Sequence, residues 1–237
     1  MTNATLEQIP RNVADVRMRI AEAATRTGRD PASIRLVAVS KSRPAAAIAA
    51  ARAGGQLEFG ENYLQEALPK LAALKAERAL VWHFIGTLQA NKTRAAAEHF
   101  AWVHTVDRER IARRLSEQRP ETLPPLNVCI EVNMCAEIAR NGVTPDGLPA
   151  LADMVADLPR LRLRGLMCIP VPARDFAARQ VPFRQLRHLL DLLNARGHAL
   201  DTLSMGMSDD FEAAIAEGAT LVRVGTAIFG ARIARHT

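Results

Sequence analysis

The stretch IRLVAVSKSRPAAAIAAARAGG, residues 34–55, contains one complete unit of a strand followed by a helix. Its first half, IRLVAVS, is a nearly continuous apolar run, which is typical of a parallel strand buried on both faces. Lys41 and Pro44 end this strand, and PAAAIAAARAGG then predicts a helix that stops at a glycine pair. This unit indicates the architecture of the whole protein, because the rest of the chain repeats it.

Seven further strand candidates follow, and each has a helix or a helical tail behind it. Such alternation predicts an α/β protein with a parallel sheet, and eight evenly spaced units complete a closed (β/α)8 TIM barrel. An open doubly wound sheet has the same element order, but no GxGxxG follows the first strand, which favours the barrel. The seven strands are expected at 57–62, 81–86, 102–107, 126–133, 161–169, 201–208 and 220–225.

The remaining segments complete one predicted domain over residues 1–237. Apolar residues recur at helical spacing from Leu6 to about Thr27, which predicts an extra N-terminal helix before a barrel at about 34–232. PVPARDFAARQVPF, residues 170–183, is the longest irregular stretch, and we interpret it as a loop over the barrel mouth.

Composition restricts the classes of function. The chain is 49% hydrophobic and 24% charged, and it contains neither a signal peptide pattern nor an apolar run long enough for a membrane helix, so we expect a cytoplasmic protein. Its net charge of +6 suits a phosphate ligand, whereas the absence of any nucleic-acid-binding motif argues against that partner. The six histidines show no metal-ligand spacing, so we expect no metal. The cysteines are expected to be buried free thiols: Cys129, Cys135 and Cys168.

Two strand ends are suited to binding a phosphate. In a barrel the active site lies at the carboxyl ends of the strands, and phosphate sites often follow strands seven and eight. SMGMSDD, residues 204–210, and RVGTAIFG, residues 223–230, place glycines and hydroxyl groups at these two ends. SMGMSDD alone is equally well explained as a helix N-cap in which Asp209 and Asp210 favour the helix dipole.

Lys41 ends the first strand and is expected to face this phosphate pocket across the barrel mouth. A partly desolvated lysine amine loses some of its preference for the charged form, and a neutral amine can form a Schiff base with a phosphorylated aldehyde. Pyridoxal phosphate is one such aldehyde, and a sugar phosphate bound by an aldolase is the alternative.

Several longer segments support a resemblance to a known family: VAVSKSRP, FGENYLQEALPK, WHFIGTLQANK, LRGLMCIP, FRQLRHL, LSMGMSDDFEAAIAEGAT and RVGTAIFGAR. Together they resemble the pyridoxal phosphate homeostasis proteins, which are similar to the N-terminal domain of alanine racemase. The resemblance runs from about Leu36 to Arg232. It implies a barrel that carries pyridoxal 5'-phosphate (PLP) on Lys41, with little or no catalysis, and keeps cellular vitamin B6 in balance. It also implies the other cofactor contacts: Asn62 beside the ring, Met205, Ser208, Gly225 and Thr226 at the phosphate, and Arg223 at the pyridine nitrogen.

An amino-acid racemase of the same barrel type is the alternative function. An arginine at the pyridine nitrogen disfavours protonation of that nitrogen, so the ring becomes a poor electron sink. Related racemases take a catalytic tyrosine from a second domain, for which we expect no room before Thr237. The one tyrosine here, Tyr63, is expected to be a helix-start residue at the rim. We therefore expect a monomer that carries PLP, with PLP-dependent apo-enzymes as possible recipients.

The loop after the fifth strand departs from the family pattern. Where relatives commonly carry serine and lysine, this chain reads VNMCAEIARNG, with Cys135, Ala139 and Arg140. Arginine keeps the positive charge but does not form a stable Schiff base, which argues against cofactor transfer from this loop. Lys92 is another amine, interpreted as a solvated residue at a helix start. His83 is interpreted as a core histidine hydrogen-bonded across the barrel.

Overall fold

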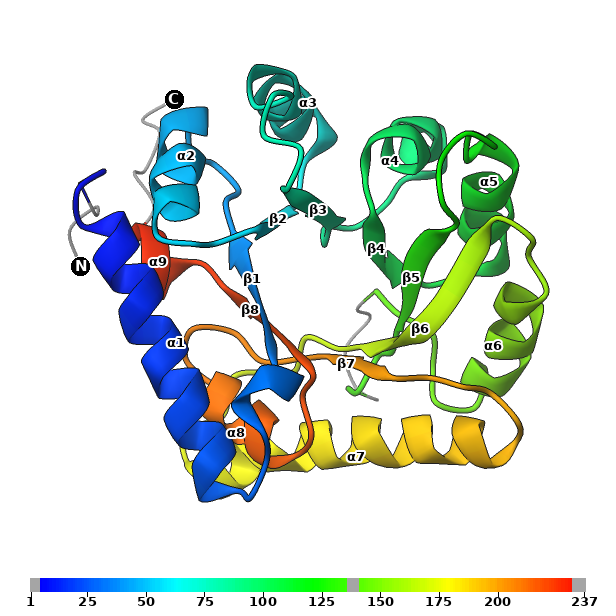
Figure 1. Cartoon of the computed structure of the whole chain (residues 1–237). Helices are drawn as coiled ribbons and strands as arrows, with labels where there is room; N and C mark the ends of the chain where they lie inside the picture. The colour runs from blue at the N-terminus through cyan, green and yellow to red at the C-terminus, as the bar shows by residue number, and fades with distance from the viewer. Residues whose placement is uncertain (1–4, 136–140, 232–237) are drawn as a thin grey trace.

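The computed structural model describes residues 5–135 and 141–231. Within these residues, parallel strands close into a barrel in sequence order (Figure 1). The predicted barrel is therefore confirmed, and the open sheet is excluded. The strands are β1 (Arg35–Val39), β2 (Glu58–Glu61), β3 (Val81–Phe84), β4 (Trp102–Val106), β5 (Leu126–Glu131), β6 (Leu161–Met167), β7 (Thr202–Ser204) and β8 (Leu221–Val224).

Helices follow the strands and cover the outside of the barrel. No helix among the described residues is both long enough and apolar enough to cross a membrane. The helices are α1 (Ile9–Arg26), α2 (Ala45–Ala53), α3 (Leu64–Ala73), α4 (Thr93–His99), α5 (Glu109–Gln118), α6 (Leu148–Ala156), α7 (Phe176–Ala195), α8 (Phe211–Ala216) and α9 (Thr226–Phe229), with single 3-10 turns η1 (Pro31–Ser33) and η2 (Ala90–Lys92).

The extra N-terminal helix is confirmed as α1, which starts three residues later than predicted. Its apolar stripe is buried against α2, α8 and α9, so it lies beside the last two described helices as well as the first unit (Figure 1). Asn12 Nδ2 donates a hydrogen bond to the carbonyl of Ile228 over 2.8 Å. The helix thus supports α9, which follows the eighth strand.

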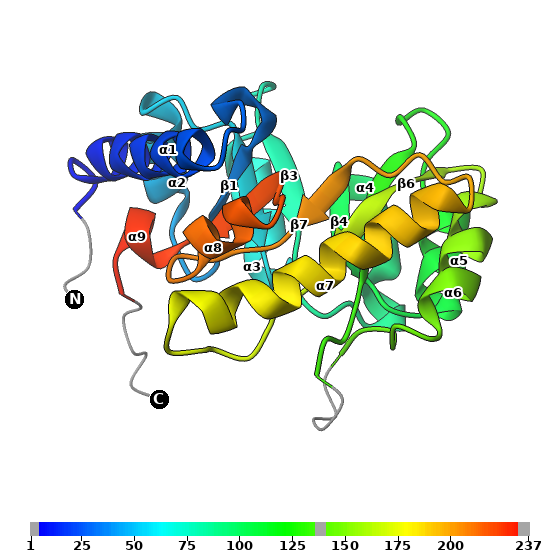
Figure 2. The same cartoon turned by 90° about the horizontal axis from the view of Figure 1, so that it is seen from below.

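Helix α7 corrects one expectation. The stretch 170–183 was expected to be irregular throughout, but α7 begins at Phe176 and includes Pro182. The carboxylate of Asp175 accepts the N–H of Ala178 over 2.7 Å, which caps the helix at this earlier point. A proline usually marks a break because it lacks an N–H, but the 20-residue helix continues through it (Figure 2).

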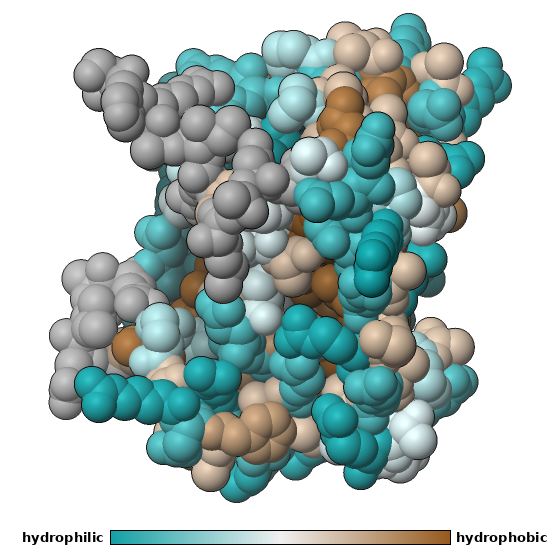
Figure 3. Space-filling view, turned by 90° about the vertical axis from the view of Figure 1, so that its left-hand side faces the viewer, coloured by the Kyte–Doolittle hydropathy of each residue, from teal (hydrophilic) through white to brown (hydrophobic). Residues whose placement is uncertain are grey.

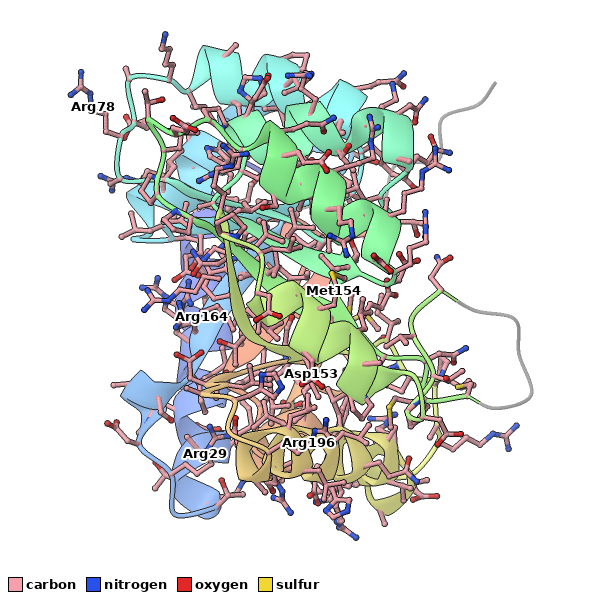
Figure 4. The ribbon with its side chains drawn as sticks, turned by 90° about the vertical axis from the view of Figure 1, so that its right-hand side faces the viewer. Arg29, Arg78, Asp153, Met154, Arg164 and Arg196 are labelled. Atoms are coloured by element: carbon pink, nitrogen blue, oxygen red, sulfur yellow. The ribbon has the colours of Figure 1, made fainter. Side chains whose placement is uncertain are left out.

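The amino end of the barrel interior is filled by an aromatic side chain that two cations contact. The guanidinium carbon of Arg35 lies 4.9 Å from the centroid of the Trp102 ring, and that of Arg164 lies 5.1 Å from it. The His83 ring stacks on Trp102 with centroids 5.5 Å apart. Arg164 is labelled in Figure 4, which shows the side chains as seen from the right-hand side of Figure 1. Because this end is filled, the opposite end remains for a ligand.

Candidate cofactor site

A cavity of about 230 Å³ lies at the carboxyl ends of β1, β2 and β8 and the loop after β7. Six of the seven predicted cofactor residues line it, although they come from four separate segments of the chain: Lys41, Asn62, Ser208, Arg223, Gly225 and Thr226. Figure 3 views the side on which α9 lies in Figure 1; brown hydrophobic side chains are visible near its centre among hydrophilic ones.

Met205 is the predicted residue that does not line the cavity. Its side chain is fully buried, and its backbone N–H donates to the carbonyl of Leu221 over 3.1 Å. Met207, two residues further on, lines the cavity instead. The sequence could not separate these two methionines, because the backbone turns at Gly206, whose φ is +93°.

Lys41 lies in a tight turn directly after β1. The turn is closed by the N–H of Arg43, which donates to the carbonyl of Ser40 over 3.1 Å. Ser42 has a φ of +60°, a conformation that costs energy for any residue other than glycine. The carboxylate of Glu66 accepts the Ser42 N–H over 2.9 Å and supports this conformation. The turn thereby fixes the backbone from which the Lys41 amine extends.

A buried ion pair joins the two strand ends that carry Lys41 and Asn62. Lys70 Nζ donates to both carboxylate oxygens of Glu61, over 2.8 and 3.0 Å, and to the carbonyl of Ser40 over 2.9 Å. The Ser40 hydroxyl donates to the same carboxylate over 2.6 Å. Burial raises the pKa of Glu61, and the Lys70 and Ser40 contacts oppose that shift. This network holds the carboxyl ends of β1 and β2 together.

The loop after β7 supplies hydrogen-bonding groups at the proposed phosphate end of the cavity. The Ser208 hydroxyl oxygen accepts the N–H groups of Gly225 and Ala227 over 3.3 and 3.4 Å, which brings the two predicted phosphate segments together. Asp210 stands at the N-cap of α8, but its carboxylate accepts the N–H of Met207 over 2.6 Å. It therefore stabilises the loop and does not cap the helix with its side chain, contrary to the N-cap interpretation.

Arg223 lies at the bottom of the cavity and is 4% exposed. Its Nη1 donates to the carbonyl and the hydroxyl of Ser204 over 2.6 and 2.7 Å, and its Nη2 donates to the carbonyl of Cys168 over 2.9 Å. These three acceptors are neutral oxygens, and burial lowers the pKa of the guanidinium. Arginine has five N–H groups, and three of them are used in these bonds.

The residues fit a phosphorylated aromatic aldehyde. Asn62 Oδ1 is buried and has no hydrogen-bond partner among the described residues, although buried polar atoms are normally satisfied. The same cavity combines this acceptor with an amine, a guanidinium, hydroxyl groups and apolar walls from Val39, Ile85 and Phe229. Such a combination can hold an aromatic ring, neutralise an anion and bond an aldehyde covalently.

Glu131 ends β5 and is 8% exposed. Burial is the main cause that raises the pKa of Glu131 to about 7, and the nearby Asp107 carboxylate adds to the shift. Burial likewise raises the pKa of Asp107, whose Oδ1 has no hydrogen-bond partner among the described residues. The carboxyl end of the barrel therefore holds buried carboxyl groups that are only partly compensated.

Other expectations concern residues outside the cavity. His83 is confirmed as a buried core histidine, with Nδ1 3.0 Å from Nε2 of His104. Tyr63 is the 57% exposed N-cap residue of α3, as expected. Lys92 is half-buried at the start of α4 and lines a neighbouring cavity of about 420 Å³, which also contacts Asn62.

The cysteine expectation holds for two of the three residues. Cys129 and Cys168 are buried free thiols, and burial raises the pKa of each to about 12. Cys135 is free but only half-buried, because it lies in the loop after β5, where its N–H donates to Asn133 Oδ1 over 2.9 Å. Ala139 and Arg140 lie outside the described residues.

Sequence reasoning missed Arg43, which is buried and lines the cavity. Its Nη2 donates to the carbonyls of Gly230 and Ala231 over 2.6 and 2.7 Å, and so joins the Lys41 turn to the segment after α9. Its position two residues after Lys41 was the one available signal. An arginine in a turn is ordinarily solvated, so this signal was weak.

The sequence matches the family described as alanine racemase, N-terminal domain, over residues 11–233. The pyridoxal phosphate homeostasis protein of Pseudomonas aeruginosa is 60% identical over 227 residues, which cover 96% of this chain and 97% of the relative. The Escherichia coli K12 protein of the same name is 53% identical over 229 residues, covering 96% and 98%. PipY of Synechococcus elongatus, solved with PLP bound, is 42% identical with a TM-score of 0.79, covering 89% of this chain and all of PipY. The chain therefore belongs to the pyridoxal phosphate homeostasis protein family, within the wider group that shares the alanine racemase N-terminal domain.

Proposed function

We propose that this protein binds PLP in the cavity at the carboxyl end of the barrel and acts in vitamin B6 homeostasis. It carries the cofactor as a Schiff base on Lys41, with little or no catalysis. The observation that carries this proposal is the convergence of six predicted cofactor residues, from four separate segments, on one cavity. The names of the relatives and the PLP bound to PipY support the choice of ligand.

Each part of the cavity has a distinct role in this proposal. Ser208, Gly225 and Thr226 bind the phosphate through hydroxyl and N–H groups, and Asn62 contacts the ring, where its buried oxygen gains a partner. Met205 supports the phosphate loop from within the core, because its N–H already donates to Leu221. Arg223 directs its remaining N–H groups toward the pyridine nitrogen.

The covalent step needs only the amine of Lys41. In its neutral form this amine could bond the aldehyde carbon covalently, with release of one water. When bound, PLP can act as an electron sink for carbanion chemistry. Arg223 limits that capacity, because a guanidinium is a permanent hydrogen-bond donor and so disfavours protonation of the ring nitrogen. We therefore assign the protein a carrier role, with PLP-dependent apo-enzymes as recipients.

The carrier and racemase functions differ in solvent exchange at the α-carbon of an amino acid. Racemases of this barrel type use a tyrosine as acid–base group, whereas Tyr63 does not line the cavity. Incubation of the PLP-loaded protein with L-alanine in deuterium oxide is expected to give exchange no faster than free PLP gives. Rapid exchange that depends on Lys41 would identify a racemase instead.

Titration with PLP, followed by visible spectroscopy, tests the binding proposal. The wild-type protein is expected to become yellow, and borohydride should remove the absorption by reducing the carbon–nitrogen bond. Lys41→Ala should lose this chromophore while its far-UV circular dichroism remains unchanged. Lys92→Ala is the matched control, because Lys92 lines the neighbouring cavity, and it should keep the chromophore. A full-intensity, borohydride-sensitive chromophore in Lys41→Ala would contradict the assignment.

A cellular measurement tests the homeostasis role. In a host strain that lacks its own relative, the wild-type gene should restore the normal PLP pool, whereas Lys41→Ala should not. Full restoration by Lys41→Ala would show that the cellular role does not depend on this amine.

A further inference from the structure

A line of polar side chains crosses the barrel interior from the cavity to the amino end. Nη1 of the guanidinium at the cavity lies 2.7 Å from the hydroxyl of a serine on β7, which is 2.8 Å from Nδ1 of a histidine on β4. Nε2 of that histidine lies 3.0 Å from Nδ1 of a histidine on β3, whose Nε2 lies 3.2 Å from a carboxylate on β2. We call these residues the interior chain: Arg223, Ser204, His104, His83 and Glu58.

The cavity end of the interior chain fixes where its protons lie. Arg223 can only donate, so the Ser204 oxygen accepts from it. Among the described contacts of the Ser204 hydroxyl, Nδ1 of His104 is the group that can accept its proton, so we assign that proton to this contact. A neutral imidazole carries one proton, so His104 carries it on Nε2 and donates to Nδ1 of His83. His83 therefore carries its own proton on Nε2, which faces Glu58.

The amino end requires the same direction. Arg35 donates to the two Glu58 oxygens over 2.9 and 2.7 Å, and contacts with His83 and Arg35 hold the pKa of Glu58 below its ordinary value despite burial. The carboxylate is therefore charged and can only accept. An Nε2 without a proton would repel it, whereas an N–H on His83 is attracted, although the contact lacks hydrogen-bond geometry.

Burial excludes other arrangements inside the chain. Ser204, His83 and His104 are 0% exposed, so no bulk water competes for their protons. Burial lowers the pKa of both histidines, and neighbouring positive groups lower that of His104 further. Both rings are thus neutral near pH 7, and each holds a single proton in a defined place.

We propose that His83 and His104 are positioning residues of the PLP site, which orient Ser204 and, through it, the Arg223 guanidinium that faces the cofactor ring. This inference rests on the proposed function. The acceptors that Arg223 has among the described residues are neutral oxygens, and the interior chain leads from one of them to the Glu58 carboxylate at the far end of the barrel. Loss of the acceptor on His104 frees the Ser204 hydroxyl to rotate and weakens the hold on Nη1.

The first test is made without cofactor. Nitrogen-15 NMR of labelled histidine in the wild-type apo protein should show His83 and His104 as neutral rings protonated on Nε2. A wild-type His104 protonated on Nδ1 would overturn the proposed direction of the chain. This measurement does not depend on PLP binding.

The second test compares variants in PLP titrations. His104→Phe removes both ring nitrogens and should shift the absorption maximum of bound PLP and weaken its Kd about tenfold. His104→Asn retains an acceptor for Ser204 and should restore most of the wild-type spectrum. Cys129→Ala is the matched control, since it truncates another buried interior side chain outside the interior chain, and its spectrum should be unchanged.

The results of these tests distinguish the positioning role of the histidines from the proposed binding of PLP. A folded His104→Phe protein with wild-type spectrum and affinity overturns the positioning role, as does a His104→Asn protein no closer to wild type than His104→Phe. If the wild-type protein forms no chromophore with PLP, the proposed function fails, and with it the role toward the cofactor, whereas the NMR result still decides the proton arrangement.

Discussion

The two ends of the barrel interior treat polar groups in opposite ways. At the amino end, Asn127 is satisfied on both sides of its amide: Nδ2 donates to the Ala101 carbonyl over 3.2 Å, and Oδ1 accepts from Arg164 over 3.1 Å. At the carboxyl end, Asn62 carries a buried oxygen with no partner among the described residues. The first arrangement stabilises the fold, and we propose that the second gains its hydrogen-bond partner from the ligand.

The two ends also differ in how they affect the pKa of a buried glutamate. Contacts with His83 and Arg35 lower the pKa of Glu58 at the amino end, whereas burial raises the pKa of Glu131 to about 7 at the carboxyl end. Among the described residues, the buried side-chain oxygens without a hydrogen-bond partner, Asn62 Oδ1 and Asp107 Oδ1, lie at the end where barrel proteins bind their ligands. We therefore expect the amino end to govern stability and the carboxyl end to govern PLP affinity.

Trp102→Ala should have the largest effect on stability. Trp102 is 3% exposed and its ring contacts the Arg35 and Arg164 guanidiniums, so its loss leaves a cavity and removes two cation contacts. We expect the free energy of unfolding to fall by about 3–5 kcal/mol, measured by urea denaturation. Tyr63→Ala, which truncates an exposed aromatic ring, should change it by less than about 0.5 kcal/mol. A Trp102→Ala loss as small as the Tyr63→Ala loss would remove the structural role assigned to the amino end.

Glu131→Gln should have an intermediate effect on stability, and this effect should depend on pH. The pKa of Glu131 is raised from 4.5 to about 7, so the folded protein binds this proton more tightly than the unfolded chain does. Stability of the apo protein should therefore fall as pH rises from 5 to 8, by about 2 kcal/mol from this group, and the glutamine variant should lose that part of the dependence.

Glu58→Gln is the control, because Glu58 should change the pH dependence of stability in the direction opposite to Glu131. The pKa of Glu58 is lowered, so its contribution to stability is present above its unfolded pKa and is lost as the pH falls through the folded value. Urea denaturation at several pH values measures both variants. Equal pH dependence in Glu131→Gln and the wild type would show that Glu131 is already ionised near pH 5.

Asn62→Ala should have the smallest effect on stability but should weaken PLP binding. Its Oδ1 has no partner to lose among the described residues, so the free energy of unfolding should change by less than about 1 kcal/mol, whereas the Kd for PLP should rise roughly fivefold to tenfold. Asn127→Ala should lower stability and leave the Kd for PLP unchanged, because it breaks two hydrogen bonds far from the cavity. Equal effects of both substitutions on PLP affinity would contradict the division between the two ends.

Much of this arrangement could be predicted from the sequence because its signals are local. Apolar strand runs and glycine stops indicate the eight units, and the rule that sites lie at the carboxyl ends of strands correctly predicts that Lys41, Ser208 and Thr226 share one cavity. The family resemblance adds Asn62 and Arg223. Residues at strand ends are the easiest to place, since the closure of the barrel fixes their positions.

The features that could not be predicted depend on tertiary contacts. Strict alternation along β4 would place Trp102, His104 and Val106 on one face, but the register shifts between Val103 and Val106. Val106 consequently packs in the outer core, while Trp102 packs with Cys129 inside the barrel. The partners of His104 lie on β3 and β7, so no short motif reveals the interior chain.

Identification of the lysine that bonds PLP tests the central claim most directly. The PLP-loaded protein is reduced with borohydride and digested, and the modified peptide is located by mass spectrometry. We predict a single reduced adduct on Lys41, in proportion to the lost visible absorption. An adduct found mainly on Lys92, Lys70 or any other lysine would contradict the account.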